Sequence, residues 1–510
     1  MPLRDKHPIS NVKKNSLLYI SLVILLFFSF FLYFYTLETY TSIESFSIVI
    51  RKWFGRFYLW LGLFCVLLLF ILAISPMGKR RLGRATDRPE FTRLAWISML
   101  YSAGMGAGIL LRAVQEPVYM MRNPPINVNT SPETIALEYT FYQWGFTAWA
   151  FYAVFAIVIG FYLFVGSKKV LSSSAFSPLE KIISSEKVRG ITFGGIDILA
   201  ILTTVFGLVA AIGLGTTQIE GGLNHLLDYD SGVTGTIAIL LLISTLAFIS
   251  AYRGVNKGIK IISTWNIYFT FALLIFVLIQ SDILAILSQF ITSLYHYIVD
   301  FIPLSIAYGN YNPGEKFLTD WTYYYWAFWL AWAPFTGIFI ARISKGRTLR
   351  ELILGVLLIP SLGTFFWFSV FGTSAFQIID SLNTYTGEFD NVFTSIFVFF
   401  EKYPFQGVIN TIAVGLLISF LVTSLDSAIF VLSMFTDNGK QTPSKKHRIL
   451  WSIILTIFAI GIILLGNSRD DINILVAMQK LLIITSLPFS LLMVLMIILF
   501  LRDYMRKEKN

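Results

Sequence analysis

Long apolar stretches constrain this 510-residue chain more than any other feature of its sequence. A helix needs about 20 mostly apolar residues to cross the hydrocarbon core of a bilayer. Twelve such stretches follow one another: 17–38, 56–76, 93–120, 138–165, 192–219, 233–252, 259–281, 320–343, 351–375, 405–435, 448–466 and 472–501. Only 13% of the residues are charged, against about 25% in soluble proteins. The sequence therefore predicts an all-α integral membrane protein, and its single cysteine, Cys65, excludes an internal disulfide.

The distribution of Lys and Arg predicts the orientation of these helices. If every stretch crosses the membrane once, 30 of the 39 basic residues fall on one side, 7 on the other, and Arg112 and Lys480 inside stretches. Because basic loops concentrate on the cytoplasmic side, we expect both termini in the cytoplasm. The net charge of +10 then reflects membrane orientation rather than nucleic-acid binding. The first stretch has no small-residue cleavage site, so we expect a retained anchor rather than a signal peptide.

Two further apolar segments are expected not to span. Residues 283–303 have helical apolar spacing with Ser, Gln, His and Asp between, which predicts an amphipathic helix on the outer membrane surface. Residues 388–401 predict a short outer helix. The short tails leave no room for a soluble catalytic domain, so the expected classes are transporter, channel or membrane-embedded enzyme.

The third stretch predicts a broken helix. Gly104, Gly106 and Gly108 alternate within it, and each glycine costs a helix about 1 kcal/mol relative to alanine. Close helix packing through small residues is one interpretation. The other is an unwound segment at a substrate site, which the nearby Glu116-Pro117 favours.

The tenth stretch predicts an ion site. Thr423, Ser424, Asp426 and Ser427 lie in mid-membrane, where polar groups are costly unless they are used. Hydroxyl and backbone carbonyl oxygens suit a small alkali cation. Alternatively, the hydroxyls bond to carbonyls of their own helix, although this does not explain Asp426.

Aromatic residues in mid-span are a third indication of a binding site. Trp and Tyr near helix ends are typical of membrane interfaces, and this accounts for 321–325, but not for Trp329 and Trp332 in mid-span. Indole faces attract cations, and quaternary ammonium groups bind in aromatic cages. Structural packing of these tryptophans is the alternative.

An ordered set of motifs resembles the betaine/choline/carnitine transporter (BCCT) family over nearly the whole chain. The motifs are G-M-G-A-G with E-P in the third stretch, T-T-V-F-G at 203–207, R-G-V-N-K-G-I-K at 253–260 and WAFWLAWAPFTGIFIARISKGRTLRELILGVLLIPSLGTFFWFSVFG at 326–372. The resemblance implies two leading helices followed by a 5+5 inverted repeat of the LeuT-like type. It implies an N-tail at 1–16, leading helices at 17–76, repeats at 93–281 and 320–501, a surface segment at 282–319 and a C-tail at 502–510.

The resemblance also implies a substrate site for a quaternary ammonium group. The implied residues are Trp144, Trp149, Tyr152, Phe328, Trp329, Trp332, Gly104, Met105, Gly106 and Gly108. Phe328 stands where the family usually has another Trp, so its weaker π-face bears on substrate preference. Gly108 stands where choline carriers tend to have an aspartate, which favours a zwitterion such as glycine betaine.

Sodium sites follow from the same resemblance. One site would use backbone carbonyls of Ser102, Met105 and Phe420 and the hydroxyls of Thr423 and Ser424. A second would use Thr204 and the ring of Phe335, but Leu208, one turn after Thr204, has no oxygen. We therefore expect one sodium ion per cycle and no other cofactor. The sodium-independent exchangers of the family have an arginine near 266–267, which this chain lacks.

Arg112 departs from the family pattern. It lies one helical turn after Gly108, and an uncompensated arginine there costs at least about 2.5–3.5 kcal/mol. It could pair internally with Glu116 or Asp426, anchor a substrate carboxylate or sulfonate, or snorkel to the surface. Lys480 is expected to snorkel.

These observations predict a non-enzymatic secondary transporter, a sodium-coupled importer of a compatible solute in a bacterial cytoplasmic membrane. The expected partners are a small-molecule solute, the lipid bilayer and two further copies of the chain in a homotrimer, with no nucleic acid. The alternatives are a sodium-independent exchanger, a carrier of another carboxylate or sulfonate solute anchored by Arg112, and a channel or non-transporting sensor.

Overall fold

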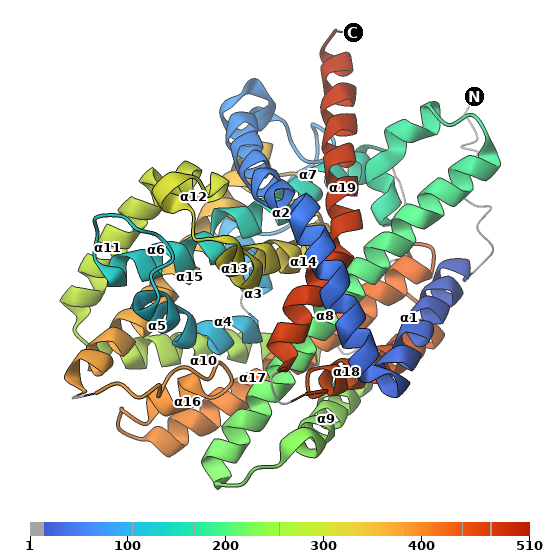
Figure 1. Cartoon of the computed structure of the whole chain (residues 1–510). Coiled ribbons are helices and arrows are strands. Elements are labelled where there is room, and N and C mark those ends of the chain that lie inside the picture. The colour runs from blue at the N-terminus through green and yellow to red at the C-terminus, as the bar shows by residue number, and fades with distance from the viewer. Residues whose placement is uncertain are drawn as a thin grey trace.

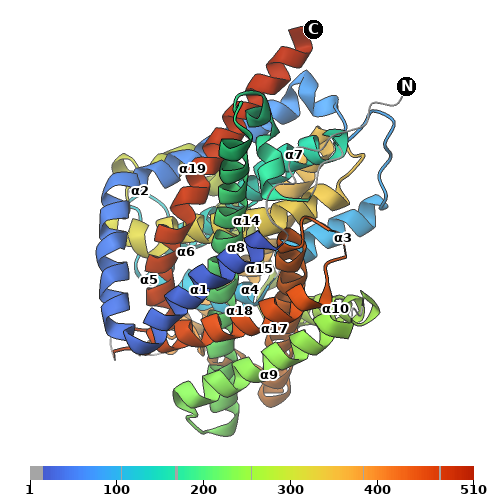
Figure 2. The ribbon, with the colours of Figure 1, turned by 90° about the vertical axis from the view of Figure 1, so that its right-hand side faces the viewer.

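The computed structural model describes residues 15–104, 106–166, 170–253, 256–382, 384–440, 442–469 and 472–509, with side chains at 101–104, 165–166, 253, 256–263 and 504–509 excluded. This part of the chain is helical almost throughout (Figures 1 and 2). Within it, extended backbone pairs at one place, between Arg81 and Thr348. The prediction of an all-α membrane protein is confirmed.

Helices α1 to α19 follow one another along the described residues. They are α1 Ser16–Phe34, α2 Thr36–Ile74, α3 Arg93–Gly104, α4 Ala107–Arg112, α5 Gln115–Arg122, α6 Pro132–Trp144, α7 Phe146–Gly166, α8 Glu186–Leu227, α9 Gly232–Arg253, α10 Asn256–Gln280, α11 Ile283–Val299, α12 Phe301–Ile306, α13 Glu315–Phe317, α14 Tyr324–Ile343, α15 Leu349–Ser381, α16 Ser395–Phe400, α17 Gln406–Thr436, α18 Lys445–Leu465 and α19 Ile474–Lys509. Short 3-10 turns lie at Pro76–Lys79, Ser172–Lys181 and Gly309–Tyr311, and a π-helical turn at Leu318–Tyr323 precedes α14.

Ten helices of the described residues are long and apolar enough to cross a membrane, and each overlaps one of the predicted stretches. The stretch 259–281 corresponds to α10, which meets α11 at a bend of 112°, and the pair counts as an eleventh candidate. The stretch 93–120 is divided among α3, α4 and α5, so no single helix crosses there. The division into two inverted repeats stays a prediction.

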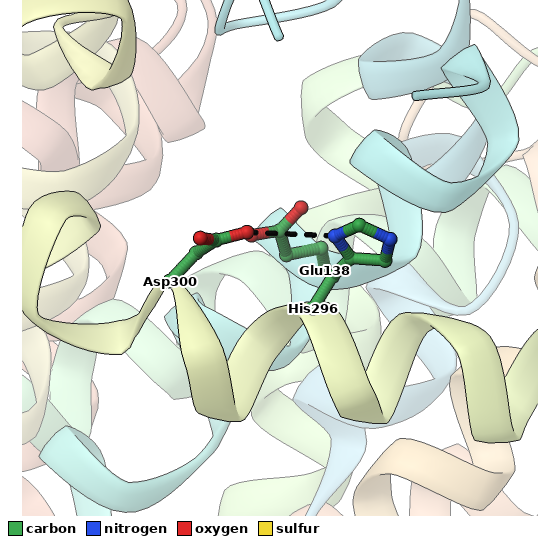
Figure 3. Close-up of side chains that lie close together, drawn as sticks. All are labelled: Glu138, His296 and Asp300. Atoms are coloured by element: carbon green, nitrogen blue, oxygen red, sulfur yellow. Dashed lines mark ion pairs between the residues drawn. The ribbon is translucent and has the colours of Figure 1, made fainter. Parts of the chain in front are cut away.

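The segment expected on the outer surface forms α11 and α12. Ile286, Ser293 and Tyr297 of α11 are buried, and the helix packs on α6 and α15. His296 and Asp300 face Glu138 of α6 at this contact (Figure 3). The short helix predicted at 388–401 begins later, as α16, because 388–394 form turns.

The centre of the bundle is built around α14. It packs against α7 most extensively and also against α8 and α19. Gly207 of α8 allows this helix to approach α14 closely, because a Cβ at Gly207 would lie 2.8 Å from the Ala331 Cβ. Helix α1 lies toward the right side of the bundle in Figure 1, α2 runs along its left edge in Figure 2, and α1 packs on α18.

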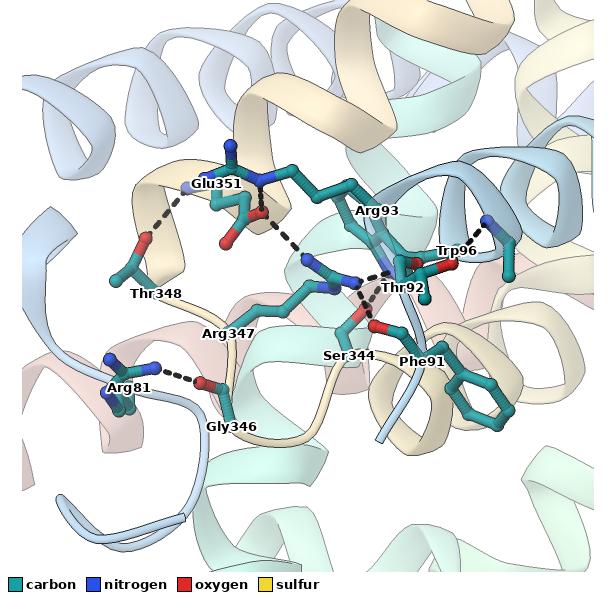
Figure 4. A network of polar contacts seen from close by, with 11 residues as sticks. Arg81, Phe91, Thr92, Arg93, Trp96, Ser344, Gly346, Arg347, Thr348 and Glu351 are labelled. Atoms are coloured by element: carbon teal, nitrogen blue, oxygen red, sulfur yellow. Dashed lines mark hydrogen bonds and ion pairs between the residues drawn. The ribbon is translucent and has the colours of Figure 1, made fainter. Parts of the chain in front are cut away.

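A polar network joins the start of α3 to the loop between α14 and α15 (Figure 4). Arg347 is 2% exposed. Its guanidinium donates to Glu351 at 2.7 Å and to the Phe91 carbonyl at 2.8 Å, and it lies 4.3 Å from the centre of the Trp96 ring. The Trp96 indole donates to the Ser344 hydroxyl at 2.9 Å. The network therefore fixes the first turn of the helix that leads into the broken third stretch.

The loop itself is held by backbone contacts. Gly346 has a φ of +80°, in the left-handed region that favours glycine. Its amide donates to the Leu82 carbonyl at 2.8 Å, and the Arg81 guanidinium donates to the Gly346 carbonyl at 2.6 Å. Hydrogen bonds thus hold the segment after α2 against the loop before α15.

We expect Arg347→Met to lower stability by about 2 kcal/mol, since it removes a buried charged donor from Glu351. Arg93→Gln is the matched control, because Arg93 is 3.1 Å from the same carboxylate but has an 83% exposed side chain. Exposed pairs contribute about 1 kcal/mol or less. Thermal unfolding in detergent would measure both variants, and equal shifts would contradict the assignment.

Candidate functional site

The third predicted stretch is broken twice. Helix α3 ends at Gly104 and α4 begins at Ala107, which agrees with the break that the glycines predict. A second break follows Arg112, before α5. Pro117 lies in the first turn of α5, where a missing N–H costs no hydrogen bond. Met105 lies outside the described residues, as do the side chains of Ser102 and Gly104.

Arg112 and Glu116 form a buried pair between the two short helices. The Arg112 side chain is 4% exposed and the Glu116 side chain 0% exposed. Arg112 Nε lies 3.9 Å from Glu116 Oε2. Arg112 Nη1 donates to Gln115 at 2.8 Å. Its guanidinium carbon lies 4.8 Å from the centre of the Trp321 ring and 6.0 Å from that of Tyr325. The structure shows the contact that one of the three interpretations of Arg112 requires, the internal ion pair with Glu116.

Glu116 connects this pair to the aromatic residues. It accepts a hydrogen bond from the Tyr325 hydroxyl, and the Trp144 indole N–H lies 3.3 Å from each of its carboxylate oxygens. A buried carboxylate is stable only when its oxygens are paired in this way. The Glu116 carboxylate therefore fixes the orientation of Trp144 relative to Arg112.

The predicted cage residues lie in one chain of ring contacts centred on Trp329. Its ring is 5.2 Å from Trp144, 5.1 Å from Phe328 and 6.3 Å from Tyr152. Tyr152 in turn contacts Trp149 at 5.6 Å with an interplanar angle of 90°. Such edge-to-face geometry is favoured between aromatic rings.

The two α14 tryptophans are fixed through their N–H groups. Trp329 donates to the Gln143 carbonyl at 2.9 Å and Trp332 to the Gly207 carbonyl at 3.2 Å. Phe328 lies 6.2 Å from Trp332, and both are half-buried. Both N–H groups are thus committed to backbone carbonyls, so only the rings can contact a ligand. Trp329 is 9% exposed, and its ring stacks on Tyr325.

The broken helix touches this aromatic chain at Gly108. A Cβ at Gly108 would lie 3.4 Å from the Trp144 ring, whereas a Cβ at Gly106 would meet no atom within 4 Å. A larger residue at 108 would press on Trp144. The size of the side chain at position 108 therefore affects the space beside the Trp144 ring.

Arg112 also lines a cavity of about 930 Å³. Cations predominate in its lining, since Arg51, Lys52, Arg56, Lys316 and Lys480 accompany Arg112, while Glu315 and Asp320 are the acids. Lys480, for which the sequence predicted snorkelling, forms an ion pair with Glu44 at 2.5 Å. The buried Arg112 Nη2 has no hydrogen-bond partner among the described residues. The cavity can therefore accept a carboxylate at its inner end.

Three predicted ligands of the first sodium site, Phe420, Thr423 and Ser424, lie on α17. Phe420 is buried, and α17 contacts α4. The Thr423 hydroxyl bonds to its own helix, at 3.0 Å from the Ser419 carbonyl and 3.1 Å from that of Phe420. Ser424 is half-buried. The sodium site stays a prediction.

The two residues of the second predicted sodium site also contact other protein groups. Thr204 donates to the Ala200 carbonyl at 2.8 Å, and Phe335 packs edge-on against Trp332 at 5.7 Å. Asp426, the carboxylate that hydroxyl back-bonding did not explain, lies near Ser250 of α9 and Arg448 of α18. It therefore interacts with neighbouring helices and not with Arg112.

Sequence reasoning missed two residues beside Arg112. The interface explanation for 321–325 is wrong for Trp321 and Tyr325, which are 6% and 3% exposed. With Trp329, they occupy positions 321, 325 and 329, so one face of the helix stacks at ring separations of 6.4 and 5.9 Å. This spacing was the signal that could have identified them.

Glu116→Gln is expected to destabilise the protein strongly, because it leaves the Arg112 cation buried without its partner. Breaking a buried pair from one side costs about 3–5 kcal/mol. The double variant Arg112→Gln/Glu116→Gln removes both charges, so we expect it to recover more than half of that loss. Thermal unfolding of the two single variants and the double variant would measure this coupling, and additive losses would show that the pair is not coupled.

Comparison with known proteins agrees with this architecture. Residues 16–509 match the model of the BCCT, betaine/carnitine/choline family transporter. The chain is 36% identical over 468 residues to the Glycine betaine transporter OpuD of Bacillus subtilis, which covers 89% of this chain and 87% of that protein. It is 31% identical to the Ectoine/hydroxyectoine transporter of Virgibacillus pantothenticus, over 90% of each chain. It is also 31% identical to the High-affinity choline transport protein of Escherichia coli, over 90% of this chain and 68% of that protein.

The match extends over the broken third stretch, the aromatic chain and the helices around them. The protein is a multi-pass membrane solute transporter rather than an enzyme, and it belongs to the betaine/carnitine/choline transporter family.

Proposed function

We propose that the protein imports a zwitterionic quaternary-ammonium solute of the glycine-betaine kind, driven by sodium, through alternating access about the broken third stretch. The observation that carries this proposal is the juxtaposition of an aromatic chain with a buried arginine. The rings centred on Trp329 suit the methylated ammonium, which cannot donate a hydrogen bond. The Arg112 guanidinium, tied to Trp144 through Glu116, suits a carboxylate.

The names of relatives agree with this substrate class. Relatives named as glycine betaine, ectoine and choline transporters match over most of this chain. These names include zwitterions and a cation, so residues at the site must distinguish them. Gly108 adds no counter-charge for a pure cation, and Arg112 would repel one.

Sodium coupling rests on the contact between α17 and α4. An ion held by oxygens of α17 and by the predicted carbonyl ligands Ser102 and Met105, which precede α4, would fix the broken segment. Binding of either ligand would then favour the other. Release of the Thr423 hydroxyl from its own helix would accompany ion binding. Association as a homotrimer belongs to the same proposal.

A second candidate function follows from the cation-lined cavity. A solute whose carboxylate or sulfonate is its main feature would use Arg112 as its anchor, with the aromatic chain as an apolar wall. A sodium-independent exchanger of related solutes would share the same binding residues. Uptake of radiolabelled glycine betaine into proteoliposomes, with and without an inward sodium gradient, separates these candidates, since only the sodium symporter accumulates the solute in response to the gradient.

Arg112→Gln should weaken glycine betaine binding at least ten-fold while leaving choline binding unchanged or stronger. The two ligands share the trimethylammonium group, and only glycine betaine has the carboxylate. Ten-fold corresponds to about 1.4 kcal/mol, below the about 1.5–3 kcal/mol of a hydrogen bond to a charged group. Binding is measured by intrinsic tryptophan fluorescence.

Arg122→Gln is the control for this substitution. Arg122 also lies over an aromatic ring, 4.7 Å from the centre of Tyr385, but it does not line the cation-rich cavity. We expect both affinities to stay unchanged in this variant. Unchanged glycine betaine affinity in Arg112→Gln would exclude Arg112 as the anchor.

Thr423→Val and Ser424→Ala should each raise the sodium concentration for half-maximal uptake several-fold, because each removes one oxygen ligand. Thr411→Val is the matched control, since the exposed Thr411 on the same helix also bonds to its own backbone, at 2.7 Å from the Gly407 carbonyl. Initial uptake rates against sodium concentration would test the site. Identical curves for all variants would place sodium elsewhere or show that it is not coupled.

A further inference from the structure

Glu138, His296 and Asp300 form a cluster at the contact between α6 and α11 (Figure 3), and none of them lines the cation-lined cavity. Each offers a nitrogen or oxygen atom, and these three atoms lie within 4.8 Å of one another. Glu138 comes from α6, whereas His296 and Asp300 are one turn apart on α11 and directly after it. The cluster thus spans the contact between two helices.

The buried carboxylate of Glu138 is the feature that points to a ligand. Glu138 is 0% exposed. Neither of its oxygens has a hydrogen-bond partner among the described residues. No Lys or Arg in the described chain forms an ion pair with Glu138 or Asp300. Two carboxylates in such a setting repel each other and are costly to bury, so a cation between them would remove both penalties.

His296 and Asp300 each present one atom to the cluster and use the other atom for a hydrogen bond outside it. His296 Nδ1 lies 3.5 Å from Asp300 Oδ2, close to the roughly 3.4 Å between two ligands of a tetrahedral zinc site. The other ring nitrogen, Nε2, lies 3.4 Å from the Thr130 hydroxyl, and the Tyr311 hydroxyl donates to Asp300 Oδ1 at 2.7 Å. Outer partners of this kind fix ligand orientation at metal sites.

Tyr311 is suited to this outer role. Its hydroxyl donates to Asp300 Oδ1 and so occupies only one of the two carboxylate oxygens. Asp300 keeps Oδ2 free to face His296 and Glu138.

We propose that Glu138, His296 and Asp300 bind one divalent transition-metal ion, with Zn²⁺ as the best match, and that this ion joins α11 to α6. One imidazole and two carboxylates suit zinc and similar ions, while a nitrogen ligand disfavours Ca²⁺ and Mg²⁺. Three protein ligands leave the fourth position for water.

The ion would stabilise a contact next to the aromatic chain. Tyr297, which follows His296, accepts a hydrogen bond from the Phe146 amide at 3.0 Å. Phe146 begins α7, two residues after Trp144 ends α6. Metal binding at the cluster would therefore restrict the α6–α7 junction that positions Trp144. This role is independent of which solute is carried.

The test uses the full chain in detergent, purified through a tag without histidines and stripped with a chelator. We expect one equivalent of Co²⁺ per chain to produce visible d–d absorption, and Zn²⁺ but not Mg²⁺ or Ca²⁺ to displace it. Zn²⁺ should also raise the unfolding temperature. Glu138→Gln and His296→Ala should each lower Co²⁺ affinity at least ten-fold and abolish the Zn²⁺-induced shift.

His225→Ala is the matched control. His225 Nε2 lies 3.0 Å from Glu401 Oε1, so it forms a His–carboxylate pair of similar geometry that has no third ligand in the described chain. We expect this variant to bind Co²⁺ as the unmodified protein does. Asp300→Asn provides a third variant if either ligand substitution prevents folding. Absence of Co²⁺ binding by the unmodified chain, or binding that persists in the folded ligand variants, would overturn the proposal.

Discussion

A guanidinium and a carboxylate, buried one turn apart in a broken helix, determine how the centre of this protein is arranged. Two unpaired buried charges would each cost several kcal/mol, and the side chains around them compensate most of this cost. Glu116 takes hydrogen bonds from Trp144 and Tyr325, and Arg112 is held by Gln115 and the Trp321 ring. The cage residue Trp144 is therefore oriented by electrostatics as well as by packing.

The same arrangement explains why the third stretch is broken twice. Gly108, in the first turn of α4, leaves out a side chain beside Trp144, and the turn after Arg112 starts a new helix whose first turn carries Glu116. An acidic residue is favoured at a helix N-terminus by the helix dipole. A continuous helix would place Glu116 in mid-helix and lose this contribution. The break thus supplies part of the stabilisation that the buried carboxylate needs.

The sequence was sufficient to predict the helical membrane class, because a run of some 20 apolar residues has few other stable outcomes. It was also sufficient for the first break, since alternating glycines weaken a helix wherever they occur. Trp321 and Tyr325 could not be assigned in the same way. Their residue types fit a membrane interface equally well, and their partners lie far away in the sequence: Glu116, which bonds to Tyr325, is 209 positions away, and Arg112 lies over the Trp321 ring. The four-residue spacing to Trp329 is the sequence signal for a common face, and the tertiary arrangement shows that this face is buried.

The charge of the cavity that Arg112 lines has a consequence for substrate choice. Six cations and two acids line this space, and Glu116 and Glu44 pair with two of the cations, Arg112 and Lys480. The excess of positive charge that remains attracts a carboxylate and repels an ammonium group. A zwitterion entering it is therefore turned with its carboxylate toward Arg112 and its ammonium group away. The aromatic chain begins on the far side of Glu116, at Trp144. In the binding mode proposed above, one solute contacts both Arg112 and the aromatic chain only after the buried Glu116 and Tyr325 move apart, because none of the predicted cage residues lines the cavity. A cation of the same size would gain the aromatic contact but lack the attraction toward Arg112.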